Sequence, residues 1–103
     1  TTWMAGNSLY SASIAALVSY ARVLALELAP RKIRVNCISP AMVWTKLLST
    51  GGRSLEQLTA DEQTYPLKRY GQPEDIAPLS VYLLSEASSW MTGSNIEITG
   101  GIH

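Results

Sequence analysis

Tyr10 carries a phenol that could donate or accept a proton, and it stands at the start of a long segment rich in Ala and Leu. A residue four positions further along a helix lies on the same face, so position 14 would neighbour the phenol. A cation at that position would lower the pKa of the tyrosine from about 10 and prepare it for acid–base chemistry. The residue there is Ile14, which carries no charge. The spacing of an acid–base pair is present, and its cation is not.

The other nucleophilic, metal-binding and glycine-rich positions favour structural roles. Cys37 lies in the apolar-rich run 33–38, which is typical of a buried and inert thiol. His103 is terminal and has no neighbouring base or ligand in the sequence. The glycine pairs at 51–52 and 100–101 lack the strand-to-helix spacing of a phosphate-binding turn, so we expect a flexible loop and a chain end. No metal site is predicted.

A long helix is predicted to position Tyr10. Asn7 or Ser8 can act as its N-cap, and residues 10–29 contain neither Gly nor Pro until Pro30 ends the segment. The apolar residues of this segment cover more than one helical face. Such a helix is expected to be buried nearly all round, which requires more than one partner surface.

The rest of the chain predicts a βαβ unit. Residues 33–39 form an apolar, β-branched strand that Pro40 closes, and residues 95–98 form a second short strand. Between them a helix is predicted over 74–85, with acidic residues at its positive end. A strand, a long crossover and a second strand indicate a right-handed unit with two parallel strands. Two further short helices, at 45–49 and 54–64, lie in a lid-like insertion over residues 44–65.

The composition predicts one soluble domain over residues 1–103. Eight basic and eight acidic residues cancel, so there is no charge pattern for a nucleic acid or an anionic membrane. A single cysteine provides no disulfide framework, which is typical of the reducing cytoplasm. No continuous apolar stretch is long enough to cross a bilayer; the segment from Leu9 to Leu28 comes closest, but Ser, Tyr, Arg and Glu interrupt it.

Several segments occur together in one order and spacing. They are Tyr10-Ser11-Ala12-Ser13 before an Ala-rich helix, Ile33-Arg34-Val35-Asn36, Ser39 to Thr45, Arg69 to Ala77, and Thr92-Gly93-Ser94 to Gly100-Gly101. In this combination the chain resembles the C-terminal part of a short-chain dehydrogenase/reductase, similar to the 3-oxoacyl-carrier-protein reductases. The resemblance implies an α/β, truncated Rossmann-like fold and the activity of an NAD(P)-dependent oxidoreductase on carbonyl and alcohol groups.

By this resemblance Tyr10 would protonate the substrate oxygen during carbonyl reduction. The family places a lysine where this chain has Ile14, and that lysine also binds the nicotinamide ribose. We therefore interpret Tyr10 as vestigial.

The same resemblance implies a cofactor-binding loop at Pro40, Ala41, Val43 and Thr45. The backbone of Val43 would contact the nicotinamide carboxamide of NAD or NADP, and the Thr45 hydroxyl would reach the cofactor. Ala41 stands where the family usually has glycine, and its Cβ restricts both backbone conformation and close ligand approach. We therefore interpret these four positions as a vestigial cofactor site; the alternative is a plain turn after a strand.

Three hypotheses about function follow. In the first, this chain alone is catalytically inactive and does not bind the cofactor, because the family's glycine-rich phosphate turn and catalytic serine would precede Thr1. In the second, it is a structural module that self-associates through the helices at 10–29 and 74–85. In the third, it is half of a split enzyme that a separate N-terminal chain completes. None of them involves nucleic acid or a membrane.

Overall fold

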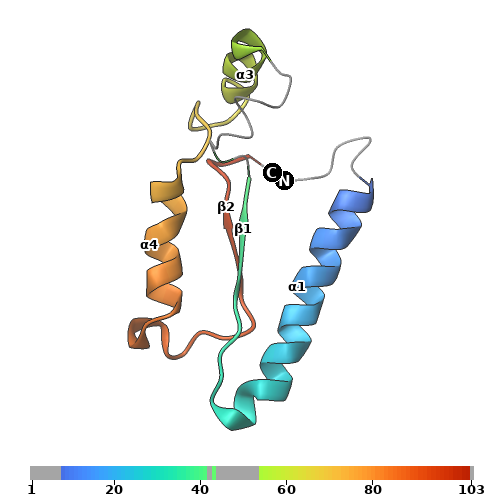
Figure 1. Ribbon diagram of the computed structural model, residues 1–103, viewed down its shortest axis with the longest axis vertical. Helices are drawn as coiled ribbons and strands as arrows, with labels where there is room; N and C mark the ends of the chain where they lie inside the picture. Colours follow the sequence, from blue (N-terminus) through green and yellow to red (C-terminus); the bar gives the residue numbers. More distant parts are fainter. Residues whose placement is uncertain (1–7, 42, 44–53, 103) are drawn as a thin grey trace.

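Two short parallel strands separate two helices in this chain (Figure 1). The computed structural model describes residues 8–41, 43 and 54–102, apart from the side chain of Tyr10. The elements in chain order are α1 (Ser8–Leu28), a 3-10 turn η1 (Ala29–Arg31), β1 (Cys37–Pro40), α3 (Leu55–Glu62), α4 (Pro73–Leu83), a 3-10 turn η2 (Glu86–Ser88) and β2 (Asn95–Ile98). The predicted short helix at 45–49 lies outside the described residues.

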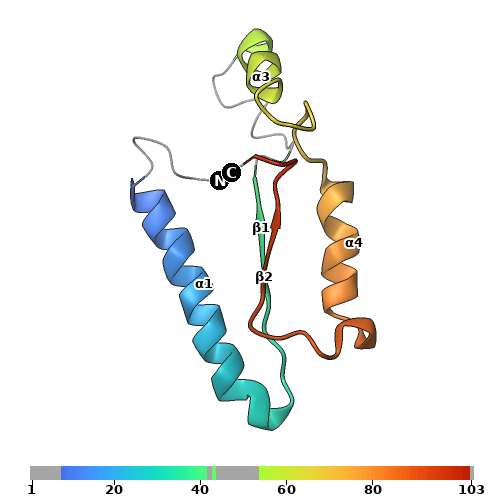
Figure 2. The same cartoon turned by 180° about the vertical axis from the view of Figure 1, so that it is seen from behind.

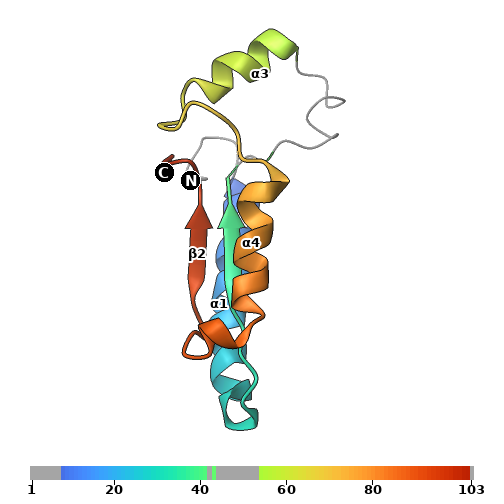
Figure 3. The same ribbon diagram turned by 90° about the vertical axis from the view of Figure 1, so that its left-hand side faces the viewer.

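The sheet consists of β1 and β2 in parallel register, with Cys37 opposite Asn95 and Pro40 opposite Ile98. Figure 3 shows the two strands side by side and pointing the same way, with α4 over one face and α1 over the other. The α/β arrangement with two parallel strands is therefore confirmed.

The first strand is shorter than predicted, since it begins at Cys37 and not at Ile33. The Ile33 amide donates back to the carbonyl of Leu28, and Val35 bonds to the turn before β2 and not to a strand. The Val35 carbonyl accepts from the Gly93 amide at 2.7 Å, and the Val35 amide donates to the Thr92 hydroxyl at 3.1 Å. The predicted start of the strand at Ile33 was wrong, because apolar composition does not show which hydrogen-bond partners the backbone of a segment will find.

Pro40 is the last residue of β1 and does not stand outside it. The amides of Cys37 and Ala41 donate toward β2, to the carbonyls of Ser94 and Ile98. Amides alternate in direction along a strand, so the nitrogen of Pro40 faces the unpaired edge of β1. A missing N–H is tolerated there because the position has no donor role.

The helix α1 is covered only along a narrow stripe of small residues. Ala21 and Ala25 are buried, whereas the larger apolar side chains of Leu17, Tyr20 and Leu26 are more than half exposed. The prediction of a helix buried nearly all round is thus not met among the described residues. A two-stranded sheet is too narrow to cover more than one helical face.

This helix also qualifies as a membrane span by length and composition. Residues 11–31 form the one such helix in the described part of the chain, with a mean hydropathy of 1.6 and 11% of the span buried. The expectation that no segment was long enough is corrected. The core helix of a soluble protein passes the same test, so this feature alone is weak evidence for a membrane location.

Arg34 joins the segment before β1 to the end of α4, a role that the sequence reading missed. Its guanidinium donates to five acceptors in residues 83–91: the carbonyls of Leu83, Ser85, Ser88 and Met91 and the Ser88 hydroxyl, at 2.8 to 3.2 Å. Carbonyls at a helix end have no partner within the helix, and here the arginine supplies their donors.

Candidate functional site

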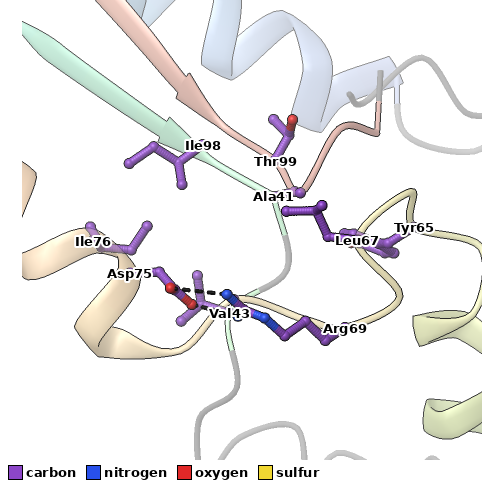
Figure 4. Close-up of a pocket in the computed structure, with 11 residues that line it drawn as sticks. Ala41, Val43, Tyr65, Leu67, Arg69, Asp75, Ile76, Ile98 and Thr99 are labelled. Atoms are coloured by element: carbon purple, nitrogen blue, oxygen red, sulfur yellow. Dashed lines mark hydrogen bonds and ion pairs between the residues drawn. The ribbon is translucent and has the colours of Figure 1, made fainter.

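A cavity of about 160 Å³ opens at the carboxyl ends of both strands. Figure 4 shows Ala41 and Val43 entering it from the end of β1, Ile98 and Thr99 from β2, and Ile76 from the first turns of α4. In open α/β sheets ligands bind at this end of the strands. The walls contributed by these residues are largely apolar.

One ion pair crosses the rim of the cavity. Arg69 Nη1 and Nη2 donate to the two carboxylate oxygens of Asp75 at 2.7 and 3.2 Å (Figure 4). Asp75 Oδ2 also accepts from the Gln72 amide at 2.6 Å, which completes the capping box at the start of α4. The hydrogen bonds from Arg69 and then from Gln72 lower the pKa of the Asp75 carboxyl from 3.8 to about 2.

The acidic residues predicted at the start of the second helix are therefore present, and Asp75 caps that helix. The pKa of Arg69 is raised, first by its hydrogen bond to Asp75 and then by the opposite charge. At neutral pH the positive charge of Arg69 and the negative charge of Asp75 cancel. The pair therefore gives the cavity rim polar groups but no net charge.

Ala41 follows β1 directly and continues its ladder. Its amide donates to the Ile98 carbonyl at 3.0 Å, and its half-buried side chain packs against the buried cluster of Leu58, Tyr65 and Tyr70. Ala41 does not adopt a positive φ angle, so its methyl group causes no backbone strain here. The predicted restriction of the backbone by this Cβ therefore has no effect in the observed conformation, whereas its restriction of close ligand approach stays a prediction.

Val43 pairs with Gly71 in an isolated parallel bridge and is half buried. The bridge ties the segment after β1 to the residues that precede α4. Thr45, the fourth predicted cofactor residue, lies outside the described residues.

Tyr10 belongs to the first turns of α1, and its side chain lies outside the described residues. Ile14 lies one turn further along the same helix and is half buried. The helical spacing between the two positions is as predicted. Position 14 holds an aliphatic side chain.

The remaining sequence candidates do not gather into a site. Cys37 is a half-buried free thiol in β1. Gly100 and Gly101 follow β2 with φ angles of +62° and +92°, and Gly100 accepts a hydrogen bond from the Leu67 amide. Within the described residues, no cluster of His, Cys, Asp and Glu could hold a metal ion. The pair at 51–52 and His103 lie outside the described residues.

The described residues fit one end of a nicotinamide cofactor. Ala41 and Val43 line the largely apolar cavity, and neither has a positive φ angle, which suits a flat ring and its carboxamide. The described ranges contain no glycine-rich strand-to-helix turn of the kind that holds a pyrophosphate. The fit is therefore limited to the nicotinamide end.

Comparison with known proteins gives consistent matches along the whole chain. A family profile described as Enoyl-(Acyl carrier protein) reductase matches residues 1–103. The uncharacterized oxidoreductase YghA of Escherichia coli is 40% identical over 94 residues, which cover 91% of this chain and 32% of that protein. The 3-oxoacyl-[acyl-carrier-protein] reductase FabG of Chlamydia pneumoniae is 36% identical over 98 residues, which cover 95% of this chain and 39% of that protein.

Solved structures show the same relationship. The RhlG/NADP active-site complex of Pseudomonas aeruginosa superposes with a TM-score of 0.88 at 34% identity, covering 100% of this chain and 42% of that one. A 4-hydroxyisoleucine dehydrogenase mutant complexed with NADH and succinate superposes with a TM-score of 0.81 at 33% identity, covering 91% of this chain and 39% of that one. The chain spans about a third of the length of the curated relatives it matches.

Proposed function

Because this chain belongs to the short-chain dehydrogenase/reductase family, we propose that it carries the tyrosine helix and the nicotinamide-side loop of an NAD(P)-dependent oxidoreductase acting on carbonyl or alcohol groups. When bound, the cofactor supplies or accepts the hydride. The positions that correspond to the family's cofactor contacts are Pro40, Ala41, Val43 and Thr45, and Tyr10 corresponds to its proton donor; we propose that all of them are vestigial in this chain alone.

The observation that carries this proposal is the position of the cavity at the strand ends. Ala41 and Val43 line it where parallel sheets bind ligands, and they do so without backbone strain. In Figure 1 the first turns of α1, which include Tyr10, lie toward this same end of the sheet. The start of α1 and the residues that follow β1 therefore lie toward the same end of the sheet.

We further propose that these 103 residues alone are catalytically inactive. Ile14 leaves the Tyr10 phenol without an adjacent cation at the helical spacing that would lower its pKa. A phenol without such a cation is almost wholly protonated at neutral pH, so it is a weak general base.

The test is reduction of an acetoacetyl thioester by the purified chain, followed by loss of NADPH or NADH absorbance. We expect no rate above the background without protein. The Ile14→Lys variant is also expected to stay inactive, since the lysine alone supplies no phosphate binding. Measurable reduction by the unmodified chain would contradict the proposed inactivity. Rescue by Ile14→Lys would show that the missing cation is the whole deficit.

A second candidate function is self-association, and the exposed apolar side chains favour it. Leu17 and Leu26 on α1, and Val81 and Leu84 at the end of α4, are more than half exposed. A second copy covering these helices would remove that surface from water, which stabilises an assembly in proportion to the apolar area buried.

Sedimentation equilibrium on the chain, with a cofactor titration on the same preparation, separates these candidates. A compact oligomer that does not bind NAD(P) is expected for a self-associating module. A monomer that gains activity when mixed with a separate nucleotide-binding chain would instead support a split enzyme. Ile14 argues against that third hypothesis, because a complementing chain would not restore the lysine.

A further inference from the structure

The helix α3 lies beyond the end of the sheet, away from both α1 and α4 (Figure 2). Its N-terminus is closed by a capping box in which the Ser54 hydroxyl accepts from the Gln57 amide and the Gln57 side chain accepts from the Ser54 amide. Only Leu58 of this helix is buried. A single eight-residue helix is marginal in water, so its orientation depends on what Leu58 and the last turn contact.

Tyr70 provides those contacts. The Tyr70 ring is fully buried and forms one cluster with Leu58 and Tyr65. Its hydroxyl donates to Asp61 Oδ2, and its backbone amide donates to Glu62 Oε2 at 3.1 Å. One residue outside the helix therefore binds two consecutive carboxylates in its last turn.

The same tyrosine also contacts the wall of the cavity. Its ring meets the Tyr65 ring edge to face, with centroids 5.5 Å apart at 87°. Its carbonyl accepts from Arg69 Nη1 at 3.1 Å. Tyr65 and Arg69 both line the cavity at the strand ends.

The turn that carries Tyr70 is itself anchored to the sheet. The Leu67 amide donates to the carbonyl of Gly100, which follows β2, at 3.0 Å. Lys68 adopts a positive φ of 62°, and its amide closes back onto the Tyr65 carbonyl at 2.8 Å. Tyr70 thus lies between a segment tied to the sheet and a helix whose one buried side chain packs on its ring.

We propose that Tyr70 holds the last turn of α3 against the cavity wall, through the bonds from its hydroxyl to Asp61 and from its amide to Glu62. The stability of the helix then depends on a residue that contacts that wall. This inference extends the proposed function, because the cavity is the one assigned to it. The experiment that tests it measures the local stability of α3 and does not require catalytic activity.

The experiment is hydrogen–deuterium exchange on the full chain, comparing amides of α3 with amides of α4. The Tyr70→Phe variant keeps the ring and removes only the hydroxyl. We expect exchange in α3 to accelerate roughly three- to tenfold, the range for loss of one hydrogen bond, while α4 keeps its rate. Asp61→Ala should have the same effect, and combining the two substitutions should add little.

A conservative variant and a matched control complete the design. Asp61→Asn retains a side-chain oxygen that can accept from the phenol, so it should restore most of the α3 protection lost in Asp61→Ala. Tyr82→Phe removes a hydroxyl from a partly exposed tyrosine of α4 and should leave α3 unchanged. Unchanged α3 exchange in Tyr70→Phe would overturn the proposal. Equal acceleration in α3 and α4 would also overturn it, because Tyr70 would then support the whole core.

Discussion

The guanidinium of Arg34 and Ser88 are joined by two hydrogen bonds across 54 positions of sequence, at 2.8 Å to the Ser88 carbonyl and 2.9 Å to its hydroxyl. Ser88 is 1% exposed, and its single hydroxyl hydrogen is shared between the carbonyls of Leu83 and Ser85. The contact closes the end of α4 against the segment that leads into β1. Both elements that border the candidate site are thereby tied together at the opposite end of the sheet.

We predict that Arg34→Lys destabilises the chain. Arginine makes five hydrogen bonds here, whereas a lysine ammonium has three donors and lacks the planar fork. The free energy of unfolding should fall by about 2–3 kcal/mol, since bonds from a charged donor are lost in a partly buried network. Chemical denaturation followed by circular dichroism measures it. Arg31→Lys, at an exposed position of η1, is the matched control and should change stability little.

The lowered pKa of Asp75 predicts that the stability of the chain falls at low pH. Its pKa is about 2 in the folded chain and 3.8 in the reference state, so the folded state favours the ionised carboxylate. The stabilisation is complete above about pH 4 and is lost as the pH falls toward 2. The melting temperature of the unmodified chain should therefore exceed that of Asp75→Asn at neutral pH, and the difference should close between pH 4 and 2.

The ion pair between Arg69 and Asp75 is partly exposed to solvent, so salt should weaken its contribution. Glu74→Gln removes a negative charge from the same helical turn, so it controls for the loss of charge alone. A melting-temperature difference for Asp75→Asn that stays constant down to pH 2 would contradict the predicted linkage.

Gly101 is predicted to resist substitution more strongly than Gly93. Both have positive φ angles, of +92° and +72°, but a Cβ on Gly101 would lie 2.8 Å from Pro66 Cβ, whereas one on Gly93 would meet Ala25 Cβ at 3.7 Å. Gly93→Ala should cost about 1–2 kcal/mol from the left-handed conformation alone. Gly101→Ala should cost more because of the added overlap. Thermal melting of the two variants gives the comparison, and equal losses would show that Pro66 moves aside.

Ile14→Lys tests whether α1 takes part in self-association. An unpaired ammonium in an apolar interface is strongly destabilising, so the variant should associate more weakly than the unmodified chain in sedimentation equilibrium. Ser19→Lys places the same charge at an exposed position of the same helix and is the control. Equal association of all three proteins would show that Ile14 does not lie in an interface between copies of the chain.

Local sequence signals determined much of the fold. Pro30 and the Ala- and Leu-rich run before it located α1, and Pro73 with Asp75 located the start of α4, because capping and backbone sterics act over a few residues. The second strand was predicted with its observed bounds, Asn95–Ile98. The separation of the two strands by a long crossover indicated parallel pairing, which is confirmed.

The tertiary structure decided where the strand begins and which polar residues matter. Residues 33–36 look like strand by composition, yet the Ile33 amide donates to Leu28, and Val35 and Asn36 find their partners in a turn more than fifty positions away. The roles of Arg34, Ser88 and Tyr70 depend on such distant partners. A sequence pattern records the side chains along one segment, whereas these hydrogen bonds and buried contacts form only once folding brings separate segments together.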